Sequence, residues 1–125
     1  MAGFIKSEAK RVETMALNQQ INKKVLDECK DYCKTLGYPM NVLIETFMQQ
    51  YVNGRFDLSS DEINKWKKDN SEKDTLNTTF NKEIYLNFKN ACKGNGYFVK
   101  HVITAFMEKF ASKKYIMEFV EVKDE

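Results

Sequence analysis

The sequence predicts a mostly helical fold with a short two-stranded antiparallel ribbon. Two observations predict it: a strand followed by two helices occurs twice along the chain, and both strands alternate apolar with short polar side chains. In residues 15–21 the apolar Leu17 and Ile21 share one parity, and residues 74–80 repeat this pattern. Because strand side chains alternate between faces, each stretch buries its apolar set and presents amides and hydroxyls outward.

Two helices follow the first strand. Asn22 suits the N-cap of a helix over residues 23–36, and Gly37 suits its C-terminal turn. Pro39 suits the first turn of a second helix, which ends near Asn53-Gly54. The apolar positions recur at helical spacing and are Val25, Cys29, Tyr32, Cys33 and Leu36, then Met40, Leu43, Ile44, Phe47 and Tyr51.

Residues 55–72 are predicted to form a helical connector. Ser59 and Ser60 before Asp61-Glu62 make a helix-start signal. Ile63 and Trp66, surrounded by lysines, indicate a short amphipathic helix. We expect Trp66 to pack on the flank of the domain.

The order of elements then repeats. Asn81 suits a helix N-cap, and Gly94-Asn95-Gly96 suits a helix stop. The apolar stripes of the two predicted helices are Ile84, Phe88, Ala91 and Cys92, then Val99, Val102, Ile103, Phe106 and Phe110.

An internal repeat underlies this recurrence. Gly37-Tyr38 returns as Gly96-Tyr97, 59 positions later, and at that offset twelve of the 32 positions from Leu17 to Met48 are identical. Chance gives roughly two identities at ordinary residue frequencies. The identical pairs are Leu17/Leu76, Asn18/Asn77, Asn22/Asn81, Lys23/Lys82, Lys30/Lys89, Cys33/Cys92, Lys34/Lys93, Gly37/Gly96, Tyr38/Tyr97, Ile44/Ile103, Phe47/Phe106 and Met48/Met107.

A unit of this kind cannot bury its own apolar faces, and a lone strand leaves unpaired edges. We therefore predict that the strands pair antiparallel and that four helices share one core. The 125 residues are predicted to form one compact domain, residues 1–125, with repeat units at 13–54 and 73–114 and an acidic tail at 115–125. Lys10 and Arg11 precede the first strand in a segment interpreted as a short helix, a basic arm or a solvated terminus.

Composition narrows the class of protein. The net charge is only +2, but seven lysines and two acids lie between Lys82 and Lys114. No apolar run reaches the ~20 residues of a membrane span, and the N-terminus lacks the apolar region of a signal peptide. We expect a cytoplasmic protein with no membrane partner.

Residues with catalytic or metal-binding chemistry are sparse. Cys29, Cys33 and Cys92 form no CxxC pair, and buried small apolar side chains are their commonest role. A metal site of Cys29 and Cys33 with His101 is conceivable, but His101 replaces Val42 in the other unit and is left unassigned. With no catalytic triad, phosphate loop or paired carboxylates, we predict no enzyme, no cofactor and no metal.

The residues resemble the ribbon-helix-helix proteins of the Arc and methionine-repressor superfamily. The resemblance covers residues 15–52 and 74–111 and rests on the alternating strand, the helix ending at Gly37 or Gly96, and the second helix just beyond it. In that family two chains each give one strand to a ribbon that enters the DNA major groove. Here the resemblance implies a tandem pseudo-dimer, in which one chain supplies both strands.

The resemblance implies specific DNA contacts. The base-contacting residues would be the outward strand residues Ala16, Asn18, Gln20, Thr75, Asn77 and Thr79. The phosphate-contacting residues would be Lys23, Lys24, Asn41, Lys82 and Lys100, with the first turns of the second helices. The chain departs from the family at the inward Gln19 and Thr78, at Ala16, which has no hydrogen-bonding side chain, and at Pro39, which lacks an amide proton.

The resemblance implies sequence-specific binding of double-stranded DNA, as a transcriptional repressor or as an accessory factor for plasmid or phage DNA processing. Self-association of pseudo-dimers on DNA stays open. Polar strand residues also fit a merely solvated face, but the return of Asn18 as Asn77 favours base contacts. The alternative is a protein-interaction module of the same fold without DNA binding, which the modest net charge and the scarcity of Arg favour.

Overall fold

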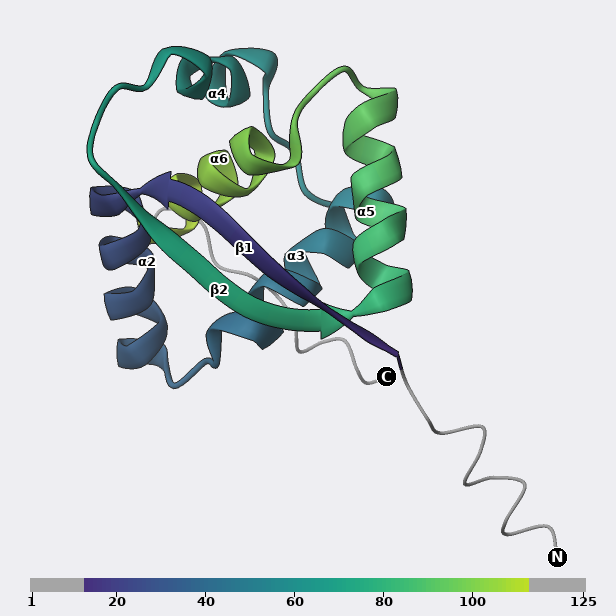
Figure 1. Ribbon diagram of the computed structural model, residues 1–125, viewed down its shortest axis with the longest axis horizontal. Helices are drawn as coiled ribbons and strands as arrows, with labels where there is room; N and C mark the ends of the chain where they lie inside the picture. The colour runs from purple at the N-terminus through teal and green to yellow at the C-terminus, as the bar shows by residue number, and fades with distance from the viewer. Residues whose placement is uncertain (1–12, 113–125) are drawn as a thin grey trace, which may run out of the picture.

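The structure, a computed structural model, describes residues 13–112. It is mostly helical and carries one antiparallel ribbon of β1 (Thr14–Asn22) and β2 (Lys73–Asn81). In Figure 1 the ribbon runs diagonally in front of α3 and α6, with α2 at the left and α5 at the right. The predicted basic arm, residues 113–114 and the acidic tail at 115–125 lie outside the described residues. The helices are α2 (Lys23–Leu36), α3 (Met40–Val52), α4 (Ser60–Asn64), η1 (Lys65–Lys68), α5 (Lys82–Gly94) and α6 (Val99–Ala111).

The ribbon confirms the predicted strands, each of which extends one residue further at both ends than the sequence pattern indicated. Its register places Asn18 directly opposite Asn77. These two residues are equivalent in the 59-residue repeat, so each strand meets its own repeat partner at the centre of the ribbon. The alternation is also confirmed, because Leu17 and Leu76 are buried while their strand neighbours on the other face are exposed.

Matching local contacts begin and end the first helix of each repeat. The side chain of Asn22 accepts a hydrogen bond from the Val25 amide at 3.0 Å, and Asn81 accepts one from Ile84 at 3.1 Å. This N-cap satisfies a helix amide that would otherwise lack a partner. At the other end, Gly37 has φ of 77° and turns the chain left-handed. Most residues with a Cβ disfavour that conformation.

The core is built by helices that cross between the repeats. Helix α2 packs against α6, and α3 packs against α5. At the centre, the rings of the repeat partners Phe47 and Phe106 stack with centroids 4.1 Å apart and planes 11° apart. Both side chains are fully buried, as the helical stripes predicted. Neither repeat could bury these surfaces alone, because each helix covers the other repeat.

Two sequence predictions about this region were wrong. Leu36 is 41% exposed rather than part of the core, because α2 ends there and the chain turns away at Gly37. Pro39 is the N-cap residue of α3 and not part of its first turn. Proline fits there because its ring fixes φ near the observed −67°, and the amide of an N-cap residue is not needed for a helical hydrogen bond.

The connector holds a short helix and a 3₁₀ turn. Ser59 and Glu62 form a reciprocal capping box at the start of α4. Ile63 is fully buried, and Trp66 of η1 is partly buried against the core, which fits its expected place on the flank. Helix α4 packs against α6, and Lys65 forms an ion pair with Glu108 at 2.8 Å. The connector therefore covers α6 as well as joining the repeats.

Candidate nucleic-acid interface

The outer face of the ribbon gathers all six predicted base-contact residues. Each of them is exposed. The register sets them in three directly opposed pairs, which are Ala16 with Thr79, Asn18 with Asn77, and Gln20 with Thr75. A two-stranded ribbon is narrow enough for the DNA major groove. The face thus presents five polar side chains and Ala16, with the amides of Asn18 and Asn77 at its centre.

The polar groups on this face are both donors and acceptors. The Gln20 side-chain amide donates to the Thr75 hydroxyl at 2.7 Å, which ties one edge of the array together. Asn18 and Asn77 each carry an amide that can donate and accept at once. That combination matches the acceptor and donor which adenine displays in the major groove. No arginine lies on either strand, so the commonest side-chain contact to guanine is missing.

The inner face anchors the ribbon to the helices. Ile21 and Phe80 are 0% and 1% exposed. Gln19 and Thr78, which depart from the resembled family, are half-buried. A one-residue slip of either strand would carry its apolar set to the solvent, so this burial fixes the register. The six outward side chains are therefore held on one face.

The first turns of α3 and α6 flank the ribbon. No described side chain caps either helix, whose N-cap residues are Pro39 and Phe98. Their first amides are consequently available to an anion. Asn41 lines a 450 Å³ cleft with residues 75–79 of β2, and Lys100 lines a second pocket with Gln20. The structure thus brings these two predicted phosphate contacts together with the ribbon.

The remaining predicted phosphate contacts lie at the ends of the ribbon. Lys23 forms an ion pair with Asp27 at 3.0 Å, and Lys82 forms one with Glu13 at 3.3 Å. The hydrogen bond to Asp27 raises the pKa of Lys23, and the charge of Asp27 adds to the effect. Lys24 is exposed. Exposed ion pairs are weak, so a phosphate can replace the carboxylate at Lys23 or Lys82.

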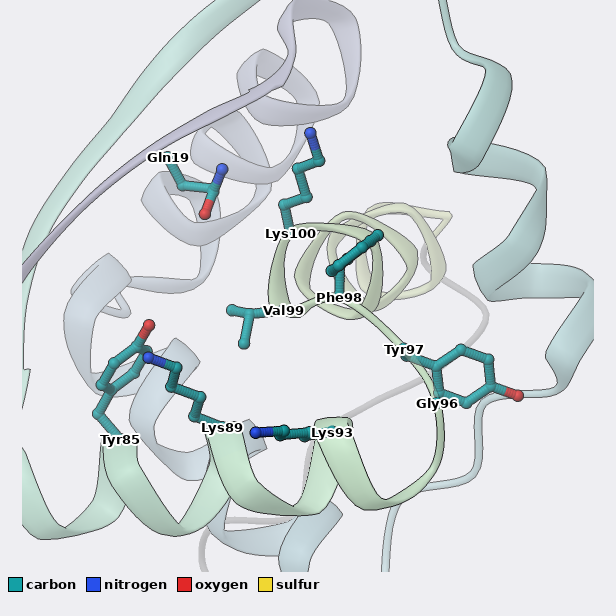
Figure 2. A pocket seen from close by; sticks show the side chains of 9 residues that line it. All are labelled: Gln19, Tyr85, Lys89, Lys93, Gly96, Tyr97, Phe98, Val99 and Lys100. Atoms are coloured by element: carbon teal, nitrogen blue, oxygen red, sulfur yellow. The ribbon is translucent and has the colours of Figure 1, made fainter.

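A larger cleft, hereafter the α5–α6 cleft, lies on the other side of the ribbon. It has a volume of about 560 Å³ and is lined by Gln19, Tyr85, Lys89, Lys93 and residues 96–100. Figure 2 shows Tyr85, Lys89 and Lys93 in a row on the face of α5 turned toward the first turn of α6, with Gln19 pointing in from β1. Their spacing of four places them on one face of the helix. Sequence analysis missed this cleft.

A polar pocket of about 180 Å³ contains His101, also not assigned from the sequence. Its lining includes Trp66, Lys67 and Asp69. His101 is 8% exposed, and its Nδ1 has no hydrogen-bond partner among residues 13–112. Burial lowers the pKa of His101, and the charges of Lys100 and Lys67 lower it further.

The sequence did contain a signal that α6 is buried on most of its sides. Residues 102–107, directly after His101, include no charged residue.

The cysteines are packed in the core. Cys29, Cys33 and Cys92 are all buried and unoxidised. Burial raises the pKa of Cys92 to about 12. A hydrogen bond with Cys33 and burial raise the pKa of Cys29. Cys29 and Cys92 are therefore poor nucleophiles, whereas the same hydrogen bond lowers the pKa of Cys33. Within residues 13–112 no three His, Cys, Asp or Glu side chains gather as metal ligands would.

Comparison with known proteins adds no relative to these observations: no family model, no curated protein and no solved structure matches the chain. Over the described residues, every helix is too short or too polar to span a bilayer.

Proposed function

We propose that this chain is a sequence-specific double-stranded DNA-binding protein that inserts the β1–β2 ribbon into the major groove. The observation that carries the proposal is the outward face of the ribbon. Six short side chains stand there in three opposed pairs with Asn18 and Asn77 at the centre. Two asparagines at the midpoint suit a base-contacting face, because each side-chain amide can bond bidentately to adenine.

The proposal includes a pseudo-dimer in which each repeat acts as one ribbon-helix-helix unit. The pairing of Asn18 with Asn77 and the stacking of Phe47 on Phe106 support it, because repeat partners meet where a two-fold axis would pass. The matching N-caps at Asn22 and Asn81 also support it. Site symmetry mirrors protein symmetry in such proteins. The DNA site is therefore expected to be an inverted repeat.

Base contacts would come from the ribbon and phosphate contacts from its surroundings. Asn18 and Asn77 would form hydrogen bonds with adenine. The hydroxyls of Thr75 and Thr79 can both donate and accept, so they would be compatible with more than one base. Lys100 and the first-turn amides of α3 and α6 would meet phosphates and fix the register on the duplex. Because the outward residues of β1 and β2 differ, the inverted repeat should be imperfect and contain A·T pairs.

Selection from random duplexes tests the proposal. The full chain is expected to enrich one A·T-containing imperfect inverted repeat, which it then binds more tightly than a scrambled duplex at one fixed salt concentration. Specific sites are typically preferred by about 10³-fold or more. Recovery of no common sequence, with equal affinity for both duplexes, would remove the ribbon as the base-contacting element. Both a repressor and a DNA-processing accessory factor fit such a site.

A protein-interaction module of the same fold is the second candidate. It is favoured by the ion pairs of Lys23 and Lys82, which engage lysines that DNA would otherwise use. The net charge of +2 favours it as well. A salt titration separates the two candidates, since phosphate contacts give a linear fall of log affinity with log salt. A chain that binds no duplex even at low salt would belong to the second class.

A further inference from the structure

The residues that line the α5–α6 cleft are not explained by the proposed binding of DNA through the ribbon. Of its lining residues three are lysines and none is acidic. Within residues 13–112, Lys89, Lys93 and Lys100 form no ion pair. Lys89 and Lys93 lie one turn apart on α5, so their positive charges repel each other, and no acidic residue of the lining compensates for the charge of the three lysines. A cleft with this unbalanced positive potential attracts an anion.

Aromatic surface accompanies the charge. Phe98 is 68% exposed, the most among the exposed large apolar side chains of the described chain. Tyr85 lines the same cleft and is half-buried, with its ring against Phe80. An exposed phenylalanine costs solvation free energy that burial under a ligand recovers. Rings beside lysines suit a ligand that is both planar and anionic.

We propose that the α5–α6 cleft binds a phosphorylated nucleoside, with the base against Phe98 and the phosphate at Lys89 and Lys93. The cleft volume of about 560 Å³ suits one nucleotide. The ligand is either a free nucleotide or an unpaired nucleotide of a DNA strand, since both present the same chemistry. The site does not require duplex binding by the ribbon and goes beyond that function.

The first repeat provides the contrast that supports this assignment. The corresponding cleft beside α3 has Lys30 where the α5–α6 cleft has Lys89, but Pro39 and Asn41 replace Phe98 and Lys100. Its lining holds one lysine and no aromatic residue. Charge and ring thus occur together on one side of the ribbon only, which a requirement common to both repeats would not produce.

The experiment measures binding of the full chain to three probes. These are a fluorescent eight-nucleotide oligothymidylate, an abasic oligomer of the same length and charge, and thymidine monophosphate. The oligothymidylate is expected to bind, and the abasic oligomer is expected to bind at least five-fold more weakly. Backbone amide shifts on titration should centre on residues 89–100. Shifts by the monophosphate at the same residues identify a free nucleotide as sufficient, whereas shifts only with the oligomer identify a strand.

Variants assign the two parts of the ligand. Phe98→Ala should weaken oligothymidylate binding by roughly 5- to 100-fold, the range of one base stacked on an aromatic ring, and leave the abasic oligomer unaffected. Lys89→Ala and Lys93→Ala should each lower the salt slope by about 0.7. The matched control variants should change neither the affinity for oligothymidylate nor the salt slope. They are Lys30→Ala, Lys34→Ala and Pro39→Ala. All these residues are exposed, so the variants should keep the fold, which circular dichroism checks.

Equal binding of the thymidylate and abasic oligomers would overturn the proposal, as would shifts centred on the ribbon. So would binding by the Phe98→Ala variant equal to that of the original chain. A blunt duplex serves as the separate test of the ribbon, because it offers no unpaired nucleotide. If the full chain binds oligothymidylate but not the blunt duplex, the proposed function is rejected and the cleft proposal stands. If it binds the blunt duplex but not oligothymidylate, the cleft proposal is rejected and the proposed function stands.

Discussion

The two sides of the ribbon start from one repeated sequence and differ in their exposed residues. Beside α3, the cleft is lined by Lys30, Met40, Asn41 and residues 75–79 of β2. Beside α6, the equivalent positions carry Lys89, Val99 and Lys100, and Phe98 replaces Pro39. One exposed position changes in the opposite sense, since Lys24 corresponds to Glu83. The surface of the second repeat is therefore not merely more basic but differently arranged.

At the centre of the core and at the helix N-caps the two repeats are alike. Phe47 and Phe106 are identical and stacked, and Asn22 and Asn81 make the same N-cap. Core packing tolerates little change in volume, whereas exposed positions tolerate most substitutions. The comparison teaches that a few shared contacts hold the two repeats in equivalent positions while exposed residues beside the ribbon differ. Equivalent residues of the two repeats can consequently serve as matched controls for one another.

The largest effect is expected in the shared core. Phe47→Ala and Phe106→Ala should each lower the free energy of unfolding by ~3–5 kcal/mol, because each removes one ring of a fully buried stacked pair. Urea unfolding followed by circular dichroism measures this. Phe98→Ala, at 68% exposure, is the control and should cost little. A large difference between Phe47→Ala and Phe106→Ala would show that the repeats do not share the core equally.

The ribbon should show a smaller, DNA-specific effect. Asn18→Ala or Asn77→Ala should lose ~1–3 kcal/mol of binding free energy against the selected site if each contacts a base bidentately. Binding to a scrambled duplex should hardly change, because non-specific affinity rests on phosphates. Parallel titrations of both duplexes at one salt concentration measure the difference. Equal losses on both duplexes, or no loss on either, would favour the protein-interaction alternative.

Salt dependence sharpens the comparison of the two flanks. Lys100→Ala should reduce the slope of log affinity against log salt by ~1, since one phosphate loses its ammonium partner. Asn41→Ala, the same position in the first repeat, should leave the slope unchanged because it carries no charge. Titrations of one duplex between 50 and 200 mM salt, a range in which phosphate contacts change affinity strongly, measure both slopes. Identical slopes for the original chain, the Lys100→Ala variant and the Asn41→Ala variant would exclude Lys100 from the interface.

Local sequence rules were enough to predict the ribbon and its outward residues. Strand parity separated Leu17 from Asn18, and the repeat offset put Asn18 and Asn77 at corresponding positions. The caps at Asn22 and Asn81 and the turn at Gly37 were predictable for the same reason, since their partners lie within a few residues.

Contacts between distant segments were not predictable in this way. Lys82 pairs with Glu13, 69 positions away, and no local pattern connects the two. The α5–α6 cleft depends on which face of α5 is turned toward α6, which is set by the packing of the whole core. Leu36 is a second case in which the local pattern did not predict the tertiary contacts. Its helical spacing predicted burial, but the helix ends before a neighbour can cover it.

The smallest expected effect is the pH dependence that His101 introduces. Burial and neighbouring lysines hold the pKa of His101 below its ordinary value of 6.5 in the folded chain. Below pH ~6.5 the unfolded chain therefore binds a proton that the folded chain resists. The stabilisation is present above that pH and is lost as the pH falls toward the folded pKa. The lowered pKa values of Asp69, at about 2, and of Glu62 act at lower pH.

Urea unfolding of the full chain at pH 7.5, 6.5 and 5.5 measures this contribution. His101→Val, which installs the residue of the first repeat, should flatten the fall in stability across this range. Val42→His is the matched control: the site is 47% exposed, so the new imidazole should titrate at an ordinary pKa and leave the profile unchanged. An equally steep profile after His101→Val would assign the pH dependence to other groups. The burial of His101 in α6 would then make no measurable contribution to the pH dependence of stability.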